Sequence, residues 1–378
     1  MIYLDNAATT YPKPEEVYQA MVDALKNKGA NPGRGAHRLA IEAGRVIFDT
    51  RNLLASLISA RKAEEIIFTS GATESINLVL KGLLVPGDHV ITTSMEHNAV
   101  YRPLKALEQQ GIKITIVQAD EKGYISAKDV EKAVIPATKL IIVNHASNVC
   151  GAVMPVTAIG EVAKNANIYF AVDGSQSLGL LPIDVQNMHI DFLAFPGHKG
   201  LYGPSGVGGV YVKSGITLKP LIEGGTGVSS SLPEMPEIIP ERYEAGTLNL
   251  PGIAGLGAGV CYVNKIGLAN IVRQGQALLE VITEGLAQVP GIKIYAPKTG
   301  AGVPVVSFNL ANHDAAEVAL LLDKKYDIAV RAGLHCAPLA HRTLGTEMTG
   351  AVRISAGTFN TEKEIMVALQ AILEISNM

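Results

Sequence analysis

The amino-acid sequence predicts an α/β protein with a large, mostly parallel sheet followed by a smaller α+β unit. Short β-branched runs alternate with segments of helical periodicity as far as about residue 215, and the pattern changes after that point. The chain has 378 residues, which is more than one ordinary hydrophobic core covers. Alternation of this kind is typical of parallel strands whose crossover helices cover both faces of the sheet.

The expected elements follow from this alternation. Strands of the large sheet are predicted over residues 65–69, 89–93, 113–117, 140–144, 168–172, 191–195 and 208–212. Helices are predicted between them, at 73–84, 100–110 and 156–165. Residues 226–240 are rich in Gly, Ser and Pro and predict a long loop, and one long helix is expected over 255–287. The smaller unit is expected to contain strands at 304–309, 328–331 and 351–355, with helices at 314–325 and 361–375. Domains are therefore predicted as an N-terminal segment contributing to the active site, a large domain and a small domain, over residues 1–15, 16–255 and 256–378.

Composition excludes several classes of protein. The formal net charge is -3 and no long basic run is present, which argues against a nucleic-acid partner. No apolar stretch approaches the roughly 20 residues of a membrane span, and the first residues lack a signal-peptide pattern. The 3 cysteines are too few and too far apart for a disulfide framework. We therefore expect a cytoplasmic protein with neither a membrane nor a nucleic acid as partner.

Polar, glycine-rich segments follow five of the predicted strands. In open parallel sheets, ligands bind beyond the carboxyl ends of the strands. Five such segments at one edge are hard to explain as five independent loops, and they predict one shared ligand. The segments are residues 70–74, 95–98, 145–148, 173–176 and 197–200.

Three of these segments carry side chains with a specific chemical use. Gly71, Ala72 and Thr73 form either a simple helix cap or a phosphate cradle, because helix N-termini present free N–H groups. Asp173 ends an apolar run, where a carboxylate needs a cation, and a protonated pyridine nitrogen would serve. Lys199 lies among glycines directly after an apolar strand. It is either a structural ion-pair partner or a lysine whose lowered pKa allows it to form a Schiff base.

Cys336 lies in a predicted loop near two basic residues, Arg331 and His335. If these residues face the thiol, they lower its pKa and make it nucleophilic; otherwise Cys336 is a small buried hydrophobe. Cys150 and Cys261 are both predicted to be small buried hydrophobic residues without a chemical role.

Two further alternatives concern the same part of the chain. A metal site from His335, Cys336 and His341 is conceivable, but the spacing matches no known zinc motif, and no metal is predicted. Arg353, on the predicted strand over 351–355, is either a surface ion-pair partner or a bidentate clamp for a substrate carboxylate.

Motifs spread over nearly the whole chain resemble the cysteine desulfurases of the class V aminotransferase superfamily, and most closely their group II, which includes selenocysteine lyase-like proteins. The matching motifs are YLDNAATT (3–10), NPGRGAH (31–37), GATE (71–74), EHNA (96–99), DGSQ (173–176), GHK (197–199), RYEAGT (242–247) and RAGLHC (331–336). The resemblance implies the aspartate aminotransferase-like fold type I of enzymes that depend on pyridoxal 5′-phosphate (PLP).

The resemblance also implies residue roles around that cofactor. Lys199 carries the cofactor as a Schiff base, and His97 stacks on its pyridine ring. Asp173 pairs with the ring nitrogen, and Gln176 contacts the phenolic oxygen. Asn148 lies beside the cofactor.

A second set of roles concerns the phosphate. Ala72, Thr73 and His198 hold it, helped by Thr247 from a second subunit, so a homodimer with a shared active site is expected. Pro196 stands where the cluster-assembly enzymes carry a hydroxyl residue that binds the phosphate. Proline has neither the hydroxyl nor an N–H group, so that contact is lost or replaced.

The implied substrate is a small amino acid. Asn148 and Arg353 bind its carboxylate, Ala8 and Arg331 complete the substrate site, and Cys336 accepts the sulfur. The implied reaction converts L-cysteine to L-alanine and leaves a persulfide on the enzyme, from which a sulfur-acceptor protein would take it.

Other activities remain open at this point. They are a selenocysteine lyase, another class V aminotransferase or β-lyase without a role for Cys336, and a non-catalytic sulfur-transfer scaffold. Cys150, at a position where a small or hydroxyl residue is expected, is a second departure from the family pattern.

Overall fold

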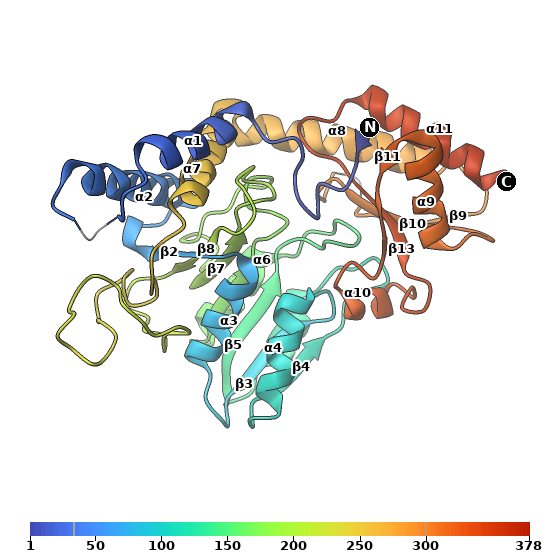
Figure 1. Cartoon of the computed structure of the whole chain (residues 1–378). Coiled ribbons are helices and arrows are strands. Elements are labelled where there is room, and N and C mark those ends of the chain that lie inside the picture. Colours follow the sequence, from blue (N-terminus) through green and yellow to red (C-terminus); the bar gives the residue numbers. More distant parts are fainter. Residues whose placement is uncertain (33–34, 299) are drawn as a thin grey trace.

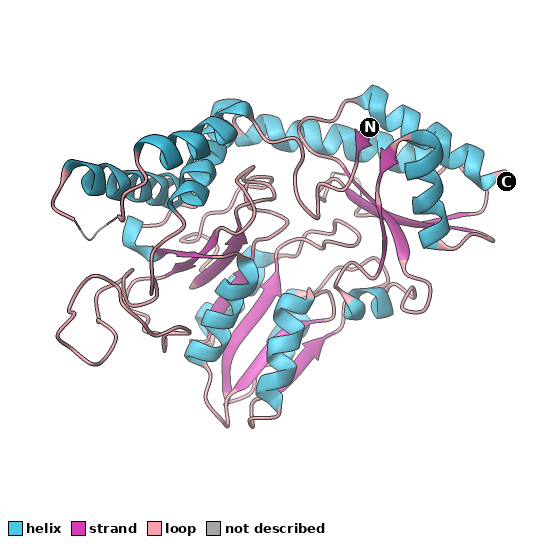
Figure 2. Cartoon of the chain, viewed as in Figure 1, coloured by secondary structure: helices cyan, strands magenta, loops and turns pink. Residues whose placement is uncertain are grey.

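The computed structural model describes residues 1–32, 35–298 and 300–378. Its strands form a larger sheet, a smaller sheet and a two-stranded pair, and the two main sheets lie in different parts of the molecule (Figures 1 and 2). Gly33 and Arg34 of the NPGRGAH motif lie outside the described residues. The predicted α/β organisation is confirmed: a 7-stranded sheet precedes a 4-stranded one along the chain.

The larger sheet is mostly parallel, as expected. Its strand order is β2-β8-β7-β6-β5-β3-β4, and only β8 runs antiparallel to its neighbours. Most of its strands are buried on both faces, which explains their continuous β-branched and aromatic composition. The strands are β2 (Ile66–Thr69), β3 (His89–Thr93), β4 (Lys113–Val117), β5 (Thr138–Asn144), β6 (Tyr169–Asp173), β7 (Phe192–Pro196) and β8 (Gly208–Val212).

Helices cover both faces of this sheet. The apolar sides of α3 (Ala72–Leu83) and α4 (Asn98–Glu108) pack in one core, and α6 (Val156–Asn165) packs in the core on the opposite face. That second core also receives α2 (Arg38–Leu57) and α5 (Ala127–Lys132). The remaining elements of this part are α1 (Glu15–Asn27), which packs on α7, and a short 3₁₀ turn over Ala63–Glu65.

The single helix expected over 255–287 is wrong. The chain forms α7 (Leu250–Ile266) and α8 (Leu268–Leu286), bent by 80° at Gly267. Gly267 has φ +84, a left-handed conformation that glycine adopts at little cost and that ends an α-helix. The bend turns α8 away from the larger sheet and carries the chain to the smaller one (Figure 1).

The smaller sheet is antiparallel, in the order β12-β13-β10-β9, and packs against α8, α9 and α11. The strand expected over 328–331 is split. Ile328 and Ala329 form β11, which pairs with β1 at the N-terminus, and Arg331 begins β12. The elements are β1 (Ile2–Tyr3), β9 (Ile292–Tyr295), β10 (Val305–Leu310), α9 (Ala315–Tyr326), β11 (Ile328–Ala329), β12 (Arg331–Gly333), α10 (Pro338–Thr343), β13 (Ala351–Ser355) and α11 (Glu362–Ser376).

The predicted boundary between residues 255 and 256 falls inside α7 and stays a prediction. Residues 226–240 form neither helix nor strand, as expected for a loop. In the described ranges, no helix alone has the length and apolar composition to cross a membrane, and α7 and α8 meet that criterion only together, across their bend.

Candidate active site

A cavity of about 430 Å³ lies between the two sheets, at the carboxyl ends of β5, β6 and β7. This is the edge at which the sequence places its polar segments. The cavity brings together residues from both parts of the molecule, which agrees with one shared ligand. Every predicted site residue except Thr247 lines it: Ala8, Ala72, Thr73, His97, Asn148, Asp173, Gln176, His198, Lys199, Arg331, Cys336 and Arg353.

Lys199 follows β7 and extends into the cavity. Within the described residues its ammonium group makes no hydrogen bond or ion pair, so the structural ion-pair alternative finds no support. Burial lowers the pKa of Lys199 to about 8, Asp173 opposes this shift, and Arg353 and Arg331 add to it. A lysine with this pKa is partly unprotonated near neutral pH and is able to act as a nucleophile or a base.

Asp173 ends β6 and is 4% exposed. Its Oδ1 accepts hydrogen bonds from the backbone N–H of Ser175, at 2.9 Å, and from the Ser175 hydroxyl. In the described part of the chain it has no ion-pair partner. A buried carboxylate without a cation is costly, so the site favours a ligand that brings a positive charge to this point.

His97 is the N-cap of α4, and its Nδ1 accepts the backbone N–H of Ala99 at 3.0 Å. Burial lowers the pKa of His97, although Asp173 opposes the shift. The ring is therefore neutral with its proton on Nε2, and the helix cap fixes its orientation. A neutral, oriented imidazole that lines the cavity is suited to stacking on a flat ring.

One end of the cavity is built to receive an anion. Helix α3 begins at Ala72 without a side-chain cap, so its first N–H groups remain available. The His198 ring lies nearby, with a buried Nδ1 that lacks a partner in the described ranges. Its pKa is about 4, lowered by burial and by the charges of Lys199 and Lys13, so the ring is neutral.

The backbone around this end is tightly packed. A Cβ atom at Gly208 would lie 2.7 Å from the Cα atom of Gly71, because β8 begins against the turn that starts α3. Pro196 is the cross-strand partner of Gly208 and lines the cavity here. Pro196, which lacks the hydroxyl that the cluster-assembly enzymes carry at this position, therefore lies next to the start of α3. This is the end of the cavity where the resemblance implies the phosphate.

Two amide side chains anchor the cavity to other segments. Gln176 donates from Nε2 to the carbonyl of Ala7 at 2.9 Å. Asn148 donates from Nδ2 to the carbonyl of His335 at 2.7 Å, and its own carbonyl accepts from Arg353. Asn148 thus joins a loop of the larger sheet to the segment that carries Cys336.

Cys336 is exposed and lies at the cavity with an unusual backbone. His335 and Cys336 have φ +47 and +57, a left-handed conformation that costs energy in non-glycine residues. The segment is held because the backbone N–H of Asn98 donates to the Cys336 carbonyl at 2.7 Å. The His335 ring bonds to the Ala351 carbonyl and packs against His341, so the expected activation of the thiol by that ring is not seen in its contacts.

Arg353 is not a surface residue, because it is only 2% exposed. It donates from Nη1 to the Asn148 carbonyl at 3.0 Å and from Nη2 to Asp5 at 2.7 Å, and its buried Nε has no partner among the residues that the structure describes. Asp5 was not singled out as a site residue by sequence reasoning. The only available signal is its position in the N-terminal motif, because nothing local predicts a contact with Arg353, 348 residues away.

Thr247, Cys150 and Cys261 lie in different environments, and the predictions for them have different outcomes. Thr247 is exposed and does not line the cavity of its own chain. Cys150 is fully buried in the core, as expected, and burial raises its pKa. The prediction that Cys261 is buried is wrong, because it lies on the exposed side of α7.

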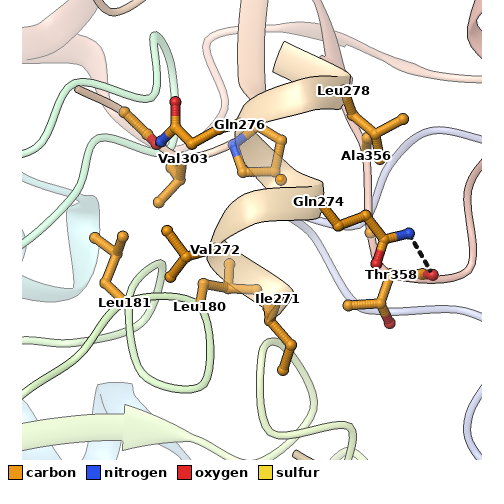
Figure 3. Close-up of a pocket in the computed structure, with 14 residues that line it drawn as sticks. Leu180, Leu181, Ile271, Val272, Gln274, Gln276, Leu278, Val303, Ala356 and Thr358 are labelled. Carbon is orange, nitrogen blue, oxygen red and sulfur yellow. Dashed lines mark hydrogen bonds between the residues drawn. The ribbon is translucent and has the colours of Figure 1, made fainter. Parts of the chain in front are cut away.

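Two other features of the described residues do not provide a comparable site. No group of three His, Cys, Asp or Glu side chains in that part is arranged to hold a metal ion. Figure 3 shows a second pocket, where Ile271 and Val272 of α8 face Leu180 and Leu181, and Gln274 donates to the Thr358 carbonyl at 3.0 Å. Its volume is about 20 Å³, which is room for one water molecule.

The large cavity fits a phosphorylated pyridine aldehyde such as PLP. Among the described residues it offers an unpaired lysine, a buried carboxylate without a cation, a neutral imidazole and an uncapped helix N-terminus with an unpartnered His198 nitrogen. Each of these features matches one part of that cofactor.

Comparison with known proteins agrees with this geometry. The family model for class V aminotransferases matches residues 2–367. A probable cysteine desulfurase of Methanothermobacter thermautotrophicus is 38% identical, over 100% of this chain and 95% of its own length. A cysteine desulfurase of Pectobacterium atrosepticum is 36% identical over 97% of this chain and 90% of its own length.

Solved structures give the same result. The apo structure of a cysteine desulfurase from Thermococcus onnurineus has a TM-score of 0.92 and 36% identity, and the match covers 100% of this chain and 94% of that one. This likeness confirms the expected fold type I. The chain belongs to the class V aminotransferase family.

Proposed function

We propose that this protein is a PLP-dependent cysteine desulfurase, which converts L-cysteine to L-alanine and leaves the sulfur on Cys336 as a persulfide. One observation carries the proposal: a single cavity holds Lys199, Asp173, Arg353 and Cys336. The names of the relatives support the same reaction, because those matched over nearly the whole chain are described as cysteine desulfurases.

Most of the residues that would hold the cofactor lie at the ends of strands of the 7-stranded sheet. Lys199 would attach it, Asp173 would pair with its ring nitrogen and His97 would stack on the ring. Gln176 would contact the phenolic oxygen, and Asn148 would lie beside the ring. The phosphate would be held by Ala72, Thr73, His198 and, from a second subunit, Thr247. When bound, PLP withdraws electrons from the α-carbon of an attached amino acid and so weakens its bonds.

The chain's own groups supply the other steps. Arg353, with Ala8 and Arg331 beside it, binds the substrate carboxylate and orients the amino acid. Lys199, with its pKa of about 8, accepts the α-proton and returns one to carbon. The Cys336 thiolate attacks the substrate sulfur: a sulfur–sulfur bond forms, the carbon–sulfur bond breaks, and carbon keeps the electron pair. The products are alanine and a persulfide, so atoms and electrons balance.

Exposure of Cys336 supports a role in sulfur transfer. The thiol lies at the surface of the cavity and not in the core, unlike Cys150. A persulfide at this position is accessible to an acceptor thiol on another protein. We therefore propose that a sulfur-acceptor protein is a partner.

A second copy of the chain is proposed to complete the site. One face of α1 exposes Tyr18, Val22 and Leu25, spaced as one helix face. A hollow of about 300 Å³ nearby is lined by Phe48 of α2 and by Leu248, next to Thr247. Exposed apolar surface around Thr247 favours burial against a second subunit, which would place Thr247 at the neighbour's phosphate.

The test is turnover of the purified, PLP-loaded protein with L-cysteine. We expect equal amounts of alanine and sulfur product, and a persulfide on Cys336 that mass spectrometry detects after one turnover. Cys336→Ala should lose cysteine turnover by about 100-fold or more but keep the cofactor absorbance, because only a thiolate accepts the sulfur efficiently.

The matched control is Cys261→Ala, which removes the other exposed thiol. It should behave as wild type. Undiminished cysteine turnover in Cys336→Ala, without a persulfide peptide, would instead assign the protein to the β-lyases or aminotransferases. Turnover with selenocysteine but not cysteine would assign it as a selenocysteine lyase.

A further inference from the structure

Two arginines face each other where the substrate carboxylate is expected. Arg331 of β12 and Arg353 of β13 are direct cross-strand partners, and both line the cavity. Like charges in such positions repel each other. Arg331 is exposed and has no ion-pair partner in the described ranges, so the pair would present a double positive charge to a ligand.

Asp5 lowers the positive charge of the arginine pair. Its Oδ1 accepts from Nη2 of Arg353 at 2.7 Å, and its side chain is 20% exposed while that of Arg353 is 2% exposed. An ion pair this far from water interacts more strongly than one on the surface. With Asp5 in place, the local sum of Arg331, Arg353 and Asp5 is one positive charge.

The position of Asp5 is fixed by its own segment. Asp5 forms a bridge with Ser355 of β13, and the next residue, Asn6, donates to the Ser355 carbonyl at 3.0 Å. The Ala7 N–H donates to the Ser355 hydroxyl at 2.9 Å. These bonds fix the backbone of Asp5 against β13 and so keep its carboxylate within reach of Arg353.

Apart from the Cys336 thiolate, which the proposed reaction itself uses, the other charged groups of the cavity are engaged elsewhere. Glu74 accepts from the backbone N–H and the hydroxyl of Ser70 at the start of α3. Asp173 and Lys199 belong to the cofactor end, as proposed above. The single positive charge at Arg331 and Arg353 thus remains for the substrate.

We propose that Asp5 is a specificity-determining residue: it reduces the charge of the Arg331–Arg353 pair to one and so selects amino acids with a single carboxylate over those with a second anionic group. This inference rests on the proposed function, because it concerns the substrate of the same site. A cysteine has one anionic group at neutral pH, whereas cysteine sulfinate has two.

Binding of two unreactive acids to the holoenzyme tests the proposal directly. Butyrate and succinate have the same carbon chain and differ by one carboxylate, and calorimetry gives both dissociation constants. Wild type should bind succinate no more tightly than butyrate. Asp5→Asn should shift the ratio of the two affinities toward succinate by about tenfold, because a nearby negative charge is removed.

Tyr3→Phe is the control. The Tyr3 hydroxyl donates to the carbonyls of Asp5 and Thr9, so its loss loosens the segment without changing its charge. The affinity ratio should stay at the wild-type value. A wild type that prefers succinate would overturn the proposal even if Asp5→Asn fails to fold, as would an unchanged ratio in folded Asp5→Asn.

Kinetics give a second measurement. The ratio of kcat/KM for cysteine sulfinate to that for cysteine should rise about tenfold in Asp5→Asn, whereas general damage to the site would lower both values together. A loss of both with an unchanged ratio would contradict the proposal. Failure of the proposed function would be distinct, because wild type would then turn over neither substrate while the binding ratio would still be measurable.

Discussion

The two walls of the cavity are built differently. The large-sheet wall comprises Lys199, Asp173, His97 and the start of α3 at Ala72, all of which follow strands of the 7-stranded sheet. The small-sheet wall comprises Arg331, Cys336 and Arg353, which stand on or beside the 4-stranded sheet. In the described part of the chain, Lys199, Asp173 and the start of α3 lack the partners that their chemistry calls for, whereas Arg353 and the Cys336 backbone are tied to other segments.

This difference separates two tasks. A wall with unsatisfied groups gains most from a ligand that stays bound, which suits a cofactor. A wall in which Arg353 and the Cys336 segment are already fixed by the chain is ready for a substrate that comes and goes, because little order has to be created at each turnover. Damage to the first wall should therefore affect cofactor attachment, and damage to the second should affect turnover alone.

The largest effect is expected at Lys199. Lys199→Ala should abolish the borohydride-reducible attachment of PLP, because this is the unpaired lysine of the cavity. Mass spectrometry of the reduced protein identifies the modified residue. Lys13→Ala is the matched control: Lys13 is also partly buried, but it is bonded to the His198 carbonyl at 2.7 Å and should not carry the cofactor. An adduct on any other lysine would show that the large-sheet wall is wrongly assigned.

An effect on turnover alone is expected at the link between the walls. Asn148→Ala removes the bond to the His335 carbonyl and should slow persulfide formation by about 10–100-fold, because the Cys336 segment shifts. Cofactor absorbance should stay near the wild-type value. Asn309→Ala also removes an amide bond to a carbonyl of the smaller sheet, away from the cavity, and should have little effect on the rate. Loss of cofactor in Asn148→Ala would contradict the assignment of cofactor binding to one wall and turnover to the other.

The unpaired Lys199 should also lower the stability of the cofactor-free protein. Its pKa falls from 10.5 to about 8 on folding, so the folded chain binds fewer protons between these values. The free energy of unfolding should therefore rise with pH from about 8 to 10.5 and carry the full penalty below pH 8. Lys199→Met should stabilise the apo-protein at pH 7 by about 2 kcal/mol. Urea unfolding at several pH values measures this difference, which should disappear above pH 10.5; a constant difference would contradict the assignment.

Glu96 is expected to affect the pH dependence of stability. It is fully buried, accepts from the Thr93 hydroxyl at 2.6 Å and from the Asn144 N–H at 3.0 Å, and burial raises its pKa to about 8. The folded chain therefore holds a proton that the unfolded chain releases near pH 4.5, and the unfolding free energy should fall as pH rises between 4.5 and 8. Glu96→Gln should remove that fall, which by the linkage used for Lys199 is at least as large, about 2 kcal/mol or more. An identical pH profile in both proteins would argue against a protonated Glu96.

The sequence predicts the large-sheet wall well because its residues depend on local pattern. Asp173 and Lys199 each follow an apolar strand, and parallel strands bring their carboxyl ends to one edge. The same local pattern does not predict the ion pair of Asp5, because its partner Arg353 is at the other end of the chain. The bend at Gly267 was missed because helical periodicity continues on both sides of it. The exposure of Cys261 was missed because it depends on which side of α7 faces the core.

The close approach of Gly208 to Gly71 limits which substitutions the enzyme tolerates beside the cofactor site. Neither residue carries a functional group, yet a single added methyl at Gly208 would meet the backbone where α3 begins. Directed evolution of the substrate site can alter Arg331 or the Cys336 segment without touching this contact. Random mutagenesis will instead lose cofactor-binding variants at Gly208, so a library aimed at new substrates gains diversity by keeping this position fixed.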